Sequence, residues 1–138
     1  MKKVLGIVDS SEHSKKDLME KAQKQSIEII FVDPEGTQEE IAQALEANPD
    51  LVFFNLGDDS YKVVDELRSL YKIIKESHYK GNILTTDPSA ASGREEVRYF
   101  YKNMNQIFTD HTFEADGSHA MGGEPLVNRI KKYLKAEK

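Results

Sequence analysis

The chain has 138 residues, of which 38% are hydrophobic and 31% charged, and its formal net charge is −5. This length and apolar content suit a single folded domain that spans residues 1–138. The acidic balance argues against nucleic acid as a partner, because the phosphate backbone is itself negative. The absence of cysteine excludes disulfides, thiol nucleophiles and thiolate metal sites.

The start of the chain carries no targeting signal of ordinary length. Its apolar run, Val4–Val8, has five residues before Asp9. That run is too short for a signal peptide or a membrane span, and no other segment reaches the length that a span needs. We therefore expect a cytoplasmic protein without a membrane partner.

Strand and helix signals alternate along the whole chain. Segments rich in branched and aromatic residues predict strands at 4–8, 27–32, 51–56, 82–86 and 106–109. Apolar residues at helical spacing predict helices from Ser10 or Ser11 to 25 and over 37–48, 60–77, 92–104 and 124–135. Thr37 and Glu40 form a capping-box pattern at the start of the second helix. Residues 110–123 read as a long polar loop, which in a compact domain is usually functional or mobile.

This alternation predicts an α/β fold of the (βα)5 kind, with right-handed crossovers and three layers. The usual solution at this size is a five-stranded parallel sheet in the flavodoxin-like order 2-1-3-4-5. In such a sheet, ligands bind at the carboxyl ends of strands one and three, where the direction of winding reverses.

The strand placement and the segment Pro49-Asp50-Leu51-Val52-Phe53-Phe54-Asn55-Leu56 resemble the receiver domain of bacterial response regulators, which has the CheY-like form of this fold. The family's third strand ends in the phosphorylated aspartate, and Asn55 stands at that position. The acidic pair after the first strand is here Asp9-Ser10, with Glu12 two residues further on. Thr86 matches the switch residue of the fourth strand. The Lys-Pro that ends the fifth strand is replaced by Asp110-His111.

These replacements predict a receiver that cannot be phosphorylated. An amide cannot form an acyl phosphate, and a single carboxylate makes a weak magnesium site. The resemblance then implies a signalling module that works through protein–protein interaction and has no catalytic residue, metal or cofactor. The degenerate pocket is predicted to consist of Asp9, Ser10, Glu12, Asn55, Thr86 and Asp110. Asp58 or Asp59 stays open as a displaced acceptor.

Three consecutive aromatic residues, Tyr99 to Tyr101, indicate a surface for a partner. Successive helical positions lie about 100° apart, so all three cannot face the core, and Tyr99 is expected to be exposed. Exposed aromatic residues are enriched at interfaces, although a tyrosine can also pack its ring and leave its hydroxyl in water. In receivers the face of helix four, strand five and helix five contacts a partner or a second copy. The predicted partner-binding residues are Tyr99, Tyr101, His111, Phe113 and His119.

One other function, the binding of a small nucleotide, remains open from the sequence. Residues 8–16 look like the start of a universal stress protein, in which case Asp9 and the Gly122-Gly123 pair would serve a small nucleotide through backbone N–H groups before the last helix. The acidic and histidine residues of the 110–123 loop contain no pair of histidines at the i, i+4 spacing of a helical zinc site, so a solvated loop without a metal is expected. An enzyme is not expected either, because no Gly-x-Ser-x-Gly elbow is present.

Overall fold

The computed structural model describes residues 1–8, 12–55, 68–70, 72–79, 81–85, 113–115 and 124–136. Its helices and strands are β1 Lys2–Val8, α1 Glu12–Gln23, β2 Ile27–Val32, α2 Gln38–Glu46, β3 Leu51–Asn55, β4 Asn82–Thr85, β5 Phe113–Ala115 and α5 Glu124–Ala136. Residues 68–70 and 72–76 are also helical, and they are called the middle helix below. Within the described residues, these bounds agree closely with the predicted ones for every element up to β4 and for the last helix.

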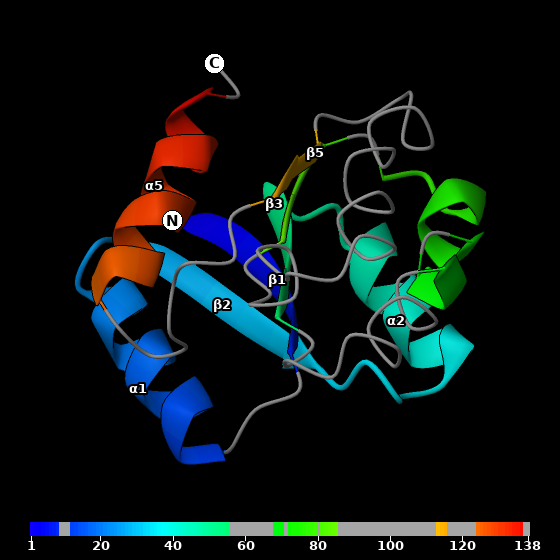
Figure 1. Ribbon diagram of the computed structural model, residues 1–138, viewed down its shortest axis with the longest axis horizontal. Helices are drawn as coiled ribbons and strands as arrows, with labels where there is room; N and C mark the ends of the chain where they lie inside the picture. Colours follow the sequence, from blue (N-terminus) through cyan, green and yellow to red (C-terminus); the bar gives the residue numbers. More distant parts are fainter. Residues whose placement is uncertain are drawn as a thin grey trace, which may run out of the picture.

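The described strands form one parallel sheet in the order β2-β1-β3-β4-β5. In Figure 1 the strands rise from β2 to β5, with α1 and α5 on one side of them and α2 and the middle helix on the other. Parallel pairing, the order of the first four strands and the helical layers confirm the arrangement expected of a flavodoxin-like fold. The predicted helix at 92–104 lies outside the described residues.

The position of the last strand differs from the prediction. The strand at the β4 edge is Phe113–Ala115, inside the segment that the sequence reads as a loop, while residues 106–109 lie outside the described part of the chain. β5 pairs with β4 through Ile83 and Phe113 and through Thr85 and Ala115. Phe-Glu-Ala does alternate, but three residues are too few for the alternation to indicate a strand. Only pairing with β4 reveals this strand, so local composition could not predict it.

Each face of the sheet carries its own apolar cluster, because successive side chains of a strand point to opposite faces. On one face, strand residues such as Leu5, Ile7 and Phe54 pack with side chains of α2 and the middle helix. On the other face, Val4, Val8 and Phe53 belong to the cluster that α1 and α5 complete. Burial on both faces explains why β3 is apolar at four successive positions.

Polar contacts fix where the helices begin and end. The Glu40 N–H donates to Thr37 Oγ1 at 3.1 Å, which confirms the predicted cap of α2. After α2, Asn48 has a φ of 55°, and after α1, Ser26 has a φ of 61°. Left-handed backbone is common for asparagine and unfavourable for serine. The turn at Ser26 is therefore a strained position in a region that leads directly into β2.

Replacement of Ser26 by glycine is expected to raise the free energy of unfolding by about 0.5–1 kcal/mol. The steric conflict of the Cβ at this φ costs about 1–2 kcal/mol, and glycine removes it. Glycine also increases the conformational entropy of the unfolded chain, which offsets part of this stabilisation. The backbone bonds of this turn, from Ser26 N–H to the Gln23 carbonyl and from Lys2 N–H to the Ser26 carbonyl, do not involve the side chain. Urea unfolding measures the change. Ser26→Ala keeps the Cβ and serves as the control; an equal gain in that variant would contradict the explanation.

Candidate functional site

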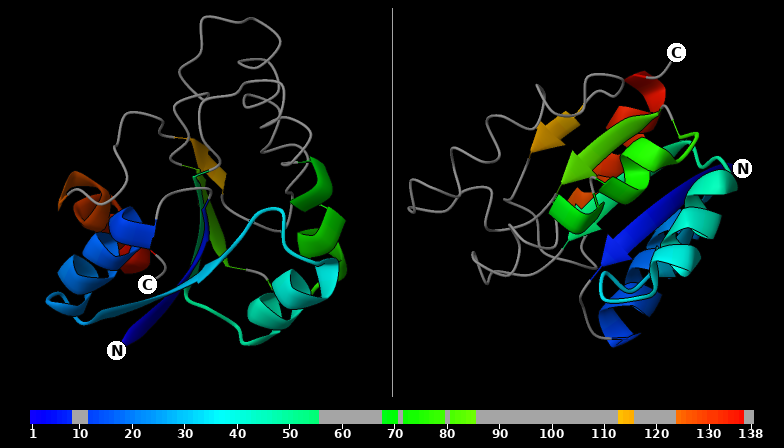
Figure 2. Two further views of the ribbon diagram at one scale, coloured as in Figure 1. Left: turned by 90° about the horizontal axis from the view of Figure 1, so that it is seen from below. Right: turned by 90° about the vertical axis from the view of Figure 1, so that its right-hand side faces the viewer.

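The carboxyl ends of the strands meet at one edge of the sheet. Val8 pairs in register with Asn55, and Thr85 pairs with both Phe54 and Ala115. Neighbouring strands lie about 4.8 Å apart, so these strand ends form a continuous row. Figure 2 (right) shows the strand arrows of β1, β4 and β5 ending toward the same side. The direction of winding reverses between β1 and β3. The ends of these two strands therefore form the part of the edge at which the sequence predicts the pocket.

Of the predicted pocket residues, the structure describes two. Asn55 is the last residue of β3, and its backbone lies beside that of Val8, the residue before Asp9. Glu12 is the first residue of α1. The remaining members, and with them Asp58 and Asp59, lie outside the described residues: Asp9, Ser10, Thr86 and Asp110. The backbone register thus places the end of β3 beside the end of β1.

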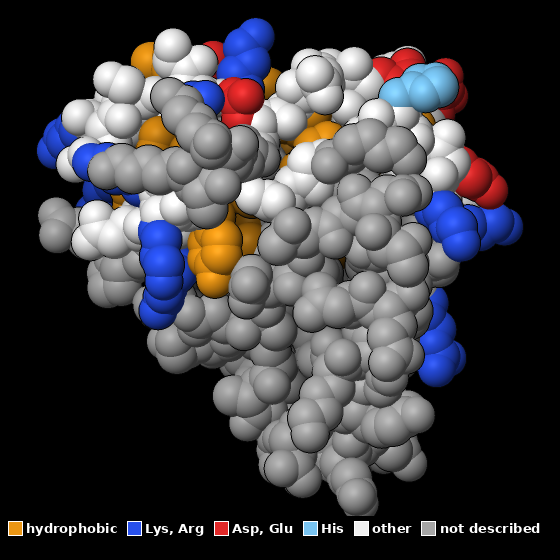
Figure 3. Space-filling model, turned by 90° about the horizontal axis from the view of Figure 1, so that it is seen from above, with side chains coloured by type: hydrophobic (Ala, Val, Ile, Leu, Met, Phe, Trp, Pro, Cys, Tyr) orange, Lys and Arg blue, Asp and Glu red, His pale blue; other side chains and the backbone are white. Residues whose placement is uncertain are grey.

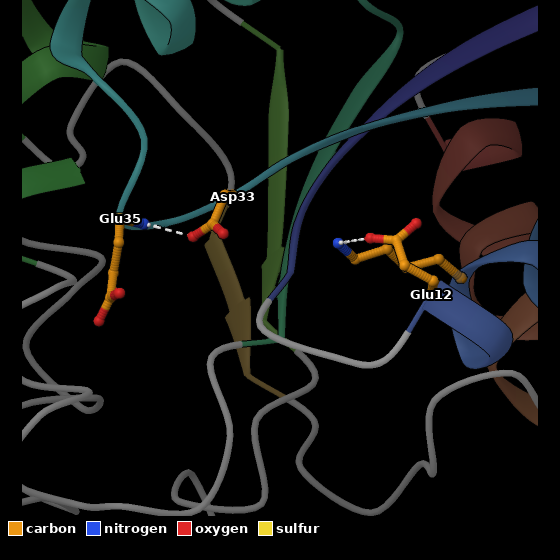
Figure 4. A network of polar contacts seen from close by, with 4 residues as sticks. Glu12, Asp33 and Glu35 are labelled. Carbon is orange, nitrogen blue, oxygen red and sulfur yellow. Dashed lines mark hydrogen bonds and ion pairs between the residues drawn. The ribbon is translucent and has the colours of Figure 1, made fainter.

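Glu12 faces solvent at the start of its helix. Its side chain is 93% exposed, and its Oε1 lies 3.4 Å from Lys15 Nζ one turn further on (Figure 4). The Lys15 side chain is only 15% exposed, so most of it packs against the protein while its Nζ contacts Glu12. A glutamate in the first turn also interacts favourably with the helix dipole. The described contacts of Glu12 are therefore those of a helix-start residue.

Two further carboxylates, those of Asp33 and Glu35, follow the end of β2 (Figure 4). Asp33 Oδ1 accepts the Glu35 N–H at 2.8 Å, and the Asp33 carbonyl accepts the Gly36 N–H at 2.9 Å. Asp33 thus closes the turn that the Asp-Pro-Glu-Gly sequence predicts. In the described part of the chain, no three or more histidine, aspartate or glutamate side chains are grouped so as to hold a metal ion.

The later position of β5 corrects the predicted end of the fifth strand. Asp110 precedes β5 in the chain, and the residue that follows this strand is Asp116. The sequence after β5, Asp116-Gly117, contains no lysine either. Phe113, predicted as a residue of a partner-binding loop, instead begins β5 and pairs with Ile83 through the backbone. The other predicted partner-binding residues lie outside the described residues: Tyr99, Tyr101, His111 and His119.

The comparisons with known proteins agree with the fold. No family model matches the sequence, and no curated protein sequence matches it. The structure is similar to the crystal structure of a response regulator from Thermotoga maritima, with a TM-score of 0.51, 13% sequence identity, and coverage of 98% of this chain and 99% of that chain. The chain therefore has a receiver-like α/β fold. None of the helices that the structure describes is long and apolar enough to cross a membrane.

Proposed function

We propose that this chain is a receiver-like signalling module that binds a protein partner and does not accept a phosphoryl group. The observation that supports the proposal best is the place of Asn55. It ends β3 directly beside the end of β1, at the point where a receiver presents its acceptor carboxylate. An amide nitrogen has its lone pair delocalised and its oxygen is a poor nucleophile, so attack on phosphorus is not available to Asn55.

The surroundings of Asn55 support the same conclusion. A phosphoryl group needs a cation beside it, and neither the residues directly after the predicted fifth strand, Asp110-His111, nor those directly after β5, Asp116-Gly117, include a lysine. The Glu12 side chain lies in solvent and contacts Lys15, so its charge is partly neutralised and less available to a magnesium ion. Asp9 would then be the main carboxylate of the pocket, and one carboxylate binds magnesium weakly.

The proposed partner surface is the face that the predicted fourth helix, β5 and α5 share. α5 buries Leu126, Val127, Ile130 and Leu134 against the sheet and leaves Asn128 and Lys132 exposed. Among its described side chains α5 also carries Arg129 and Lys131; Figure 3 shows lysine and arginine side chains on this side of the molecule and on the opposite side. A cationic outer surface on an acidic chain favours a partner with acidic groups, because complementary potentials orient and speed the encounter. Tyr99 and Tyr101 would add the aromatic contacts.

A titration with magnesium and beryllofluoride, a mimic of the phosphoryl group, tests the first half of the proposal. Amide resonances of Val8, Asn55 and Thr85 are expected to stay unchanged in two-dimensional NMR spectra. Asn55→Asp is the matched variant, and a response in this variant alone would show that the amide is what disables the pocket. Shifts of these three resonances in the unaltered protein would show a working phosphoryl pocket and would refute the proposal.

Separate samples distinguish the other possibilities. Addition of ATP is expected to leave the spectrum unchanged; shifts at Val8 and Glu124 would favour the nucleotide-binding alternative.

Partner capture is then compared between the unaltered protein and Tyr99→Ala, with Glu39→Ala on the exposed side of α2 as the control. Loss of capture in the tyrosine variant alone supports the proposed surface, and equal capture by all three proteins contradicts it.

A further inference from the structure

A hollow of about 510 Å³ lies at the amino edge of the sheet, at the opposite ends of the strands from Asn55. In Figure 2 (right) this is the side on which the N-terminus lies. Four segments that are far apart in the sequence line it: the start of β1, the turn between α1 and β2, the residue before β3, and α5. The hollow is therefore a product of the fold, and the function proposed above makes no use of it.

Two lysines give this hollow its positive charge. Lys131 Nζ donates to Gln25 Oε1 at 3.0 Å, a neutral amide oxygen. Among the described residues, neither Lys131 nor Lys2 has a carboxylate within ion-pair distance. Asp50, the acidic residue of the lining, directs Oδ2 to the Lys3 N–H at 2.8 Å and donates its own N–H to the Lys3 carbonyl at 2.7 Å. The side chains of the lining thus have a net charge of one positive unit in a chain whose net charge is −5.

The remaining lining is apolar where it is deepest. Ile27 is 2% exposed and Leu134 is 4% exposed, so both contribute the inner wall. Met1, which is 74% exposed, lies at the outer part of the lining, so a change in its side-chain conformation would disrupt little packing. An unbranched, flexible methionine can adjust to an occupant. Cations around an apolar wall suit a molecule with one anionic group and an apolar body.

We propose that the hollow binds a small organic anion, a carboxylate or sulfonate carried on an apolar ring or chain. The anionic group would lie between Lys2 and Lys131, and the apolar body would lie against Ile27 and Leu134. The volume falls within the range of ligand pockets, about 300–1,000 Å³. Ammonium groups form charge-assisted hydrogen bonds with such anions, and these bonds are about twice as strong as neutral ones.

The probe for this proposal is 8-anilinonaphthalene-1-sulfonate, whose fluorescence rises in an apolar environment. N-phenyl-1-naphthylamine has the same rings without the sulfonate and serves as the neutral control. The sulfonate is expected to bind at least about fivefold more tightly than the neutral compound, a factor typical for a charge-assisted contact. Equal affinity of the two compounds would show that the lysines do not select an anion and would overturn the proposal.

Variants locate the binding. Lys2→Gln and Lys131→Gln are each expected to weaken sulfonate binding about five- to tenfold. The control is Lys132→Gln, the next residue of α5, whose exposed ammonium lies 6.0 Å from the centroid of the Tyr133 ring and outside the lining. Amide shifts on addition of the sulfonate are expected at Gln25, Ser26 and Asp50. Shifts at other places, or unchanged affinity in both lysine variants, would overturn the proposal.

Discussion

Replacement of Gly6 by alanine is expected to lower the free energy of unfolding by about 1–3 kcal/mol, the usual cost of overfilling a packed core. Gly6 lies in β1 between Phe31 of β2 and Phe53 of β3, which are its register partners on either side. A Cβ at this position would lie 2.8 Å from two atoms of the Phe53 ring and 3.0 Å from the Phe31 ring. Phe53 is fully buried, so its ring has no free space into which it can move.

The two rings explain why this glycine occupies a central strand. Phe31 and Phe53 meet edge to face across Gly6, with ring centroids 6.4 Å apart and planes at 79°. Such aromatic pairs contribute about 0.5–1.5 kcal/mol beyond the area that they bury. The rings of Phe31 and Phe53 thus occupy the space that a side chain at Gly6 would take. The packing of the apolar cluster on the α1 and α5 face therefore depends on the absence of a side chain at Gly6.

A double-mutant cycle with Phe53→Leu tests this explanation. Leucine removes the ring atoms that a Cβ at Gly6 would meet, and by itself it should cost about 1 kcal/mol. We expect the Gly6→Ala and Phe53→Leu double variant to be more stable than the sum of the single changes by at least about 0.5 kcal/mol. Urea unfolding of the four proteins gives the coupling. Strict additivity would show that the glycine is required for some reason other than the Phe53 ring.

The sequence predicts most of the fold because its strong signals are local. The four branched or apolar residues of Leu51–Phe54, the capping pattern at Thr37 and the Asp33 turn each depend on residues a few positions apart, and each is found in the structure. β5 has no such signal. It is three residues long and its identity as a strand comes from β4, which lies about thirty positions earlier in the chain.

The candidate site is predictable to a smaller extent. The end of the third strand is located to within one residue, since the predicted strand runs over 51–56 and β3 ends at Asn55; the resemblance to receivers is what singles out Asn55. The role of Glu12 could not be predicted in the same way. An acidic residue a few positions after a strand can serve either a metal or the first turn of a helix, and in the structure Glu12 begins α1 and contacts Lys15. The hollow at the amino edge has no sequence motif, since its lining comes from four separate segments.

Tyr79 connects the end of the middle helix to the start of β4. Its side chain is 1% exposed and belongs to the cluster on the α2 face. Its hydroxyl donates to the carbonyl of Asn82, and its N–H donates to Ser77 Oγ at 3.2 Å. The ring thus combines apolar burial with a polar contact at the first residue of β4. Since Thr85 ends the same strand, this contact also helps to place the edge at which Asn55 lies.

Tyr79→Ala is expected to lower the free energy of unfolding by about 3–5 kcal/mol, the usual cost of removing a buried aromatic ring. Tyr79→Phe keeps the ring and deletes the hydrogen bond that the hydroxyl donates to the Asn82 carbonyl, so its cost should be about 1–3 kcal/mol. Urea unfolding separates the two contributions. Amide hydrogen exchange adds the local test: in the phenylalanine variant, protection should fall first in β4, from Ile83 to Thr85. Equal protection of β4 in this variant and the unaltered protein would show that the hydroxyl does not hold the strand, and the stability of the region would then come from the ring alone.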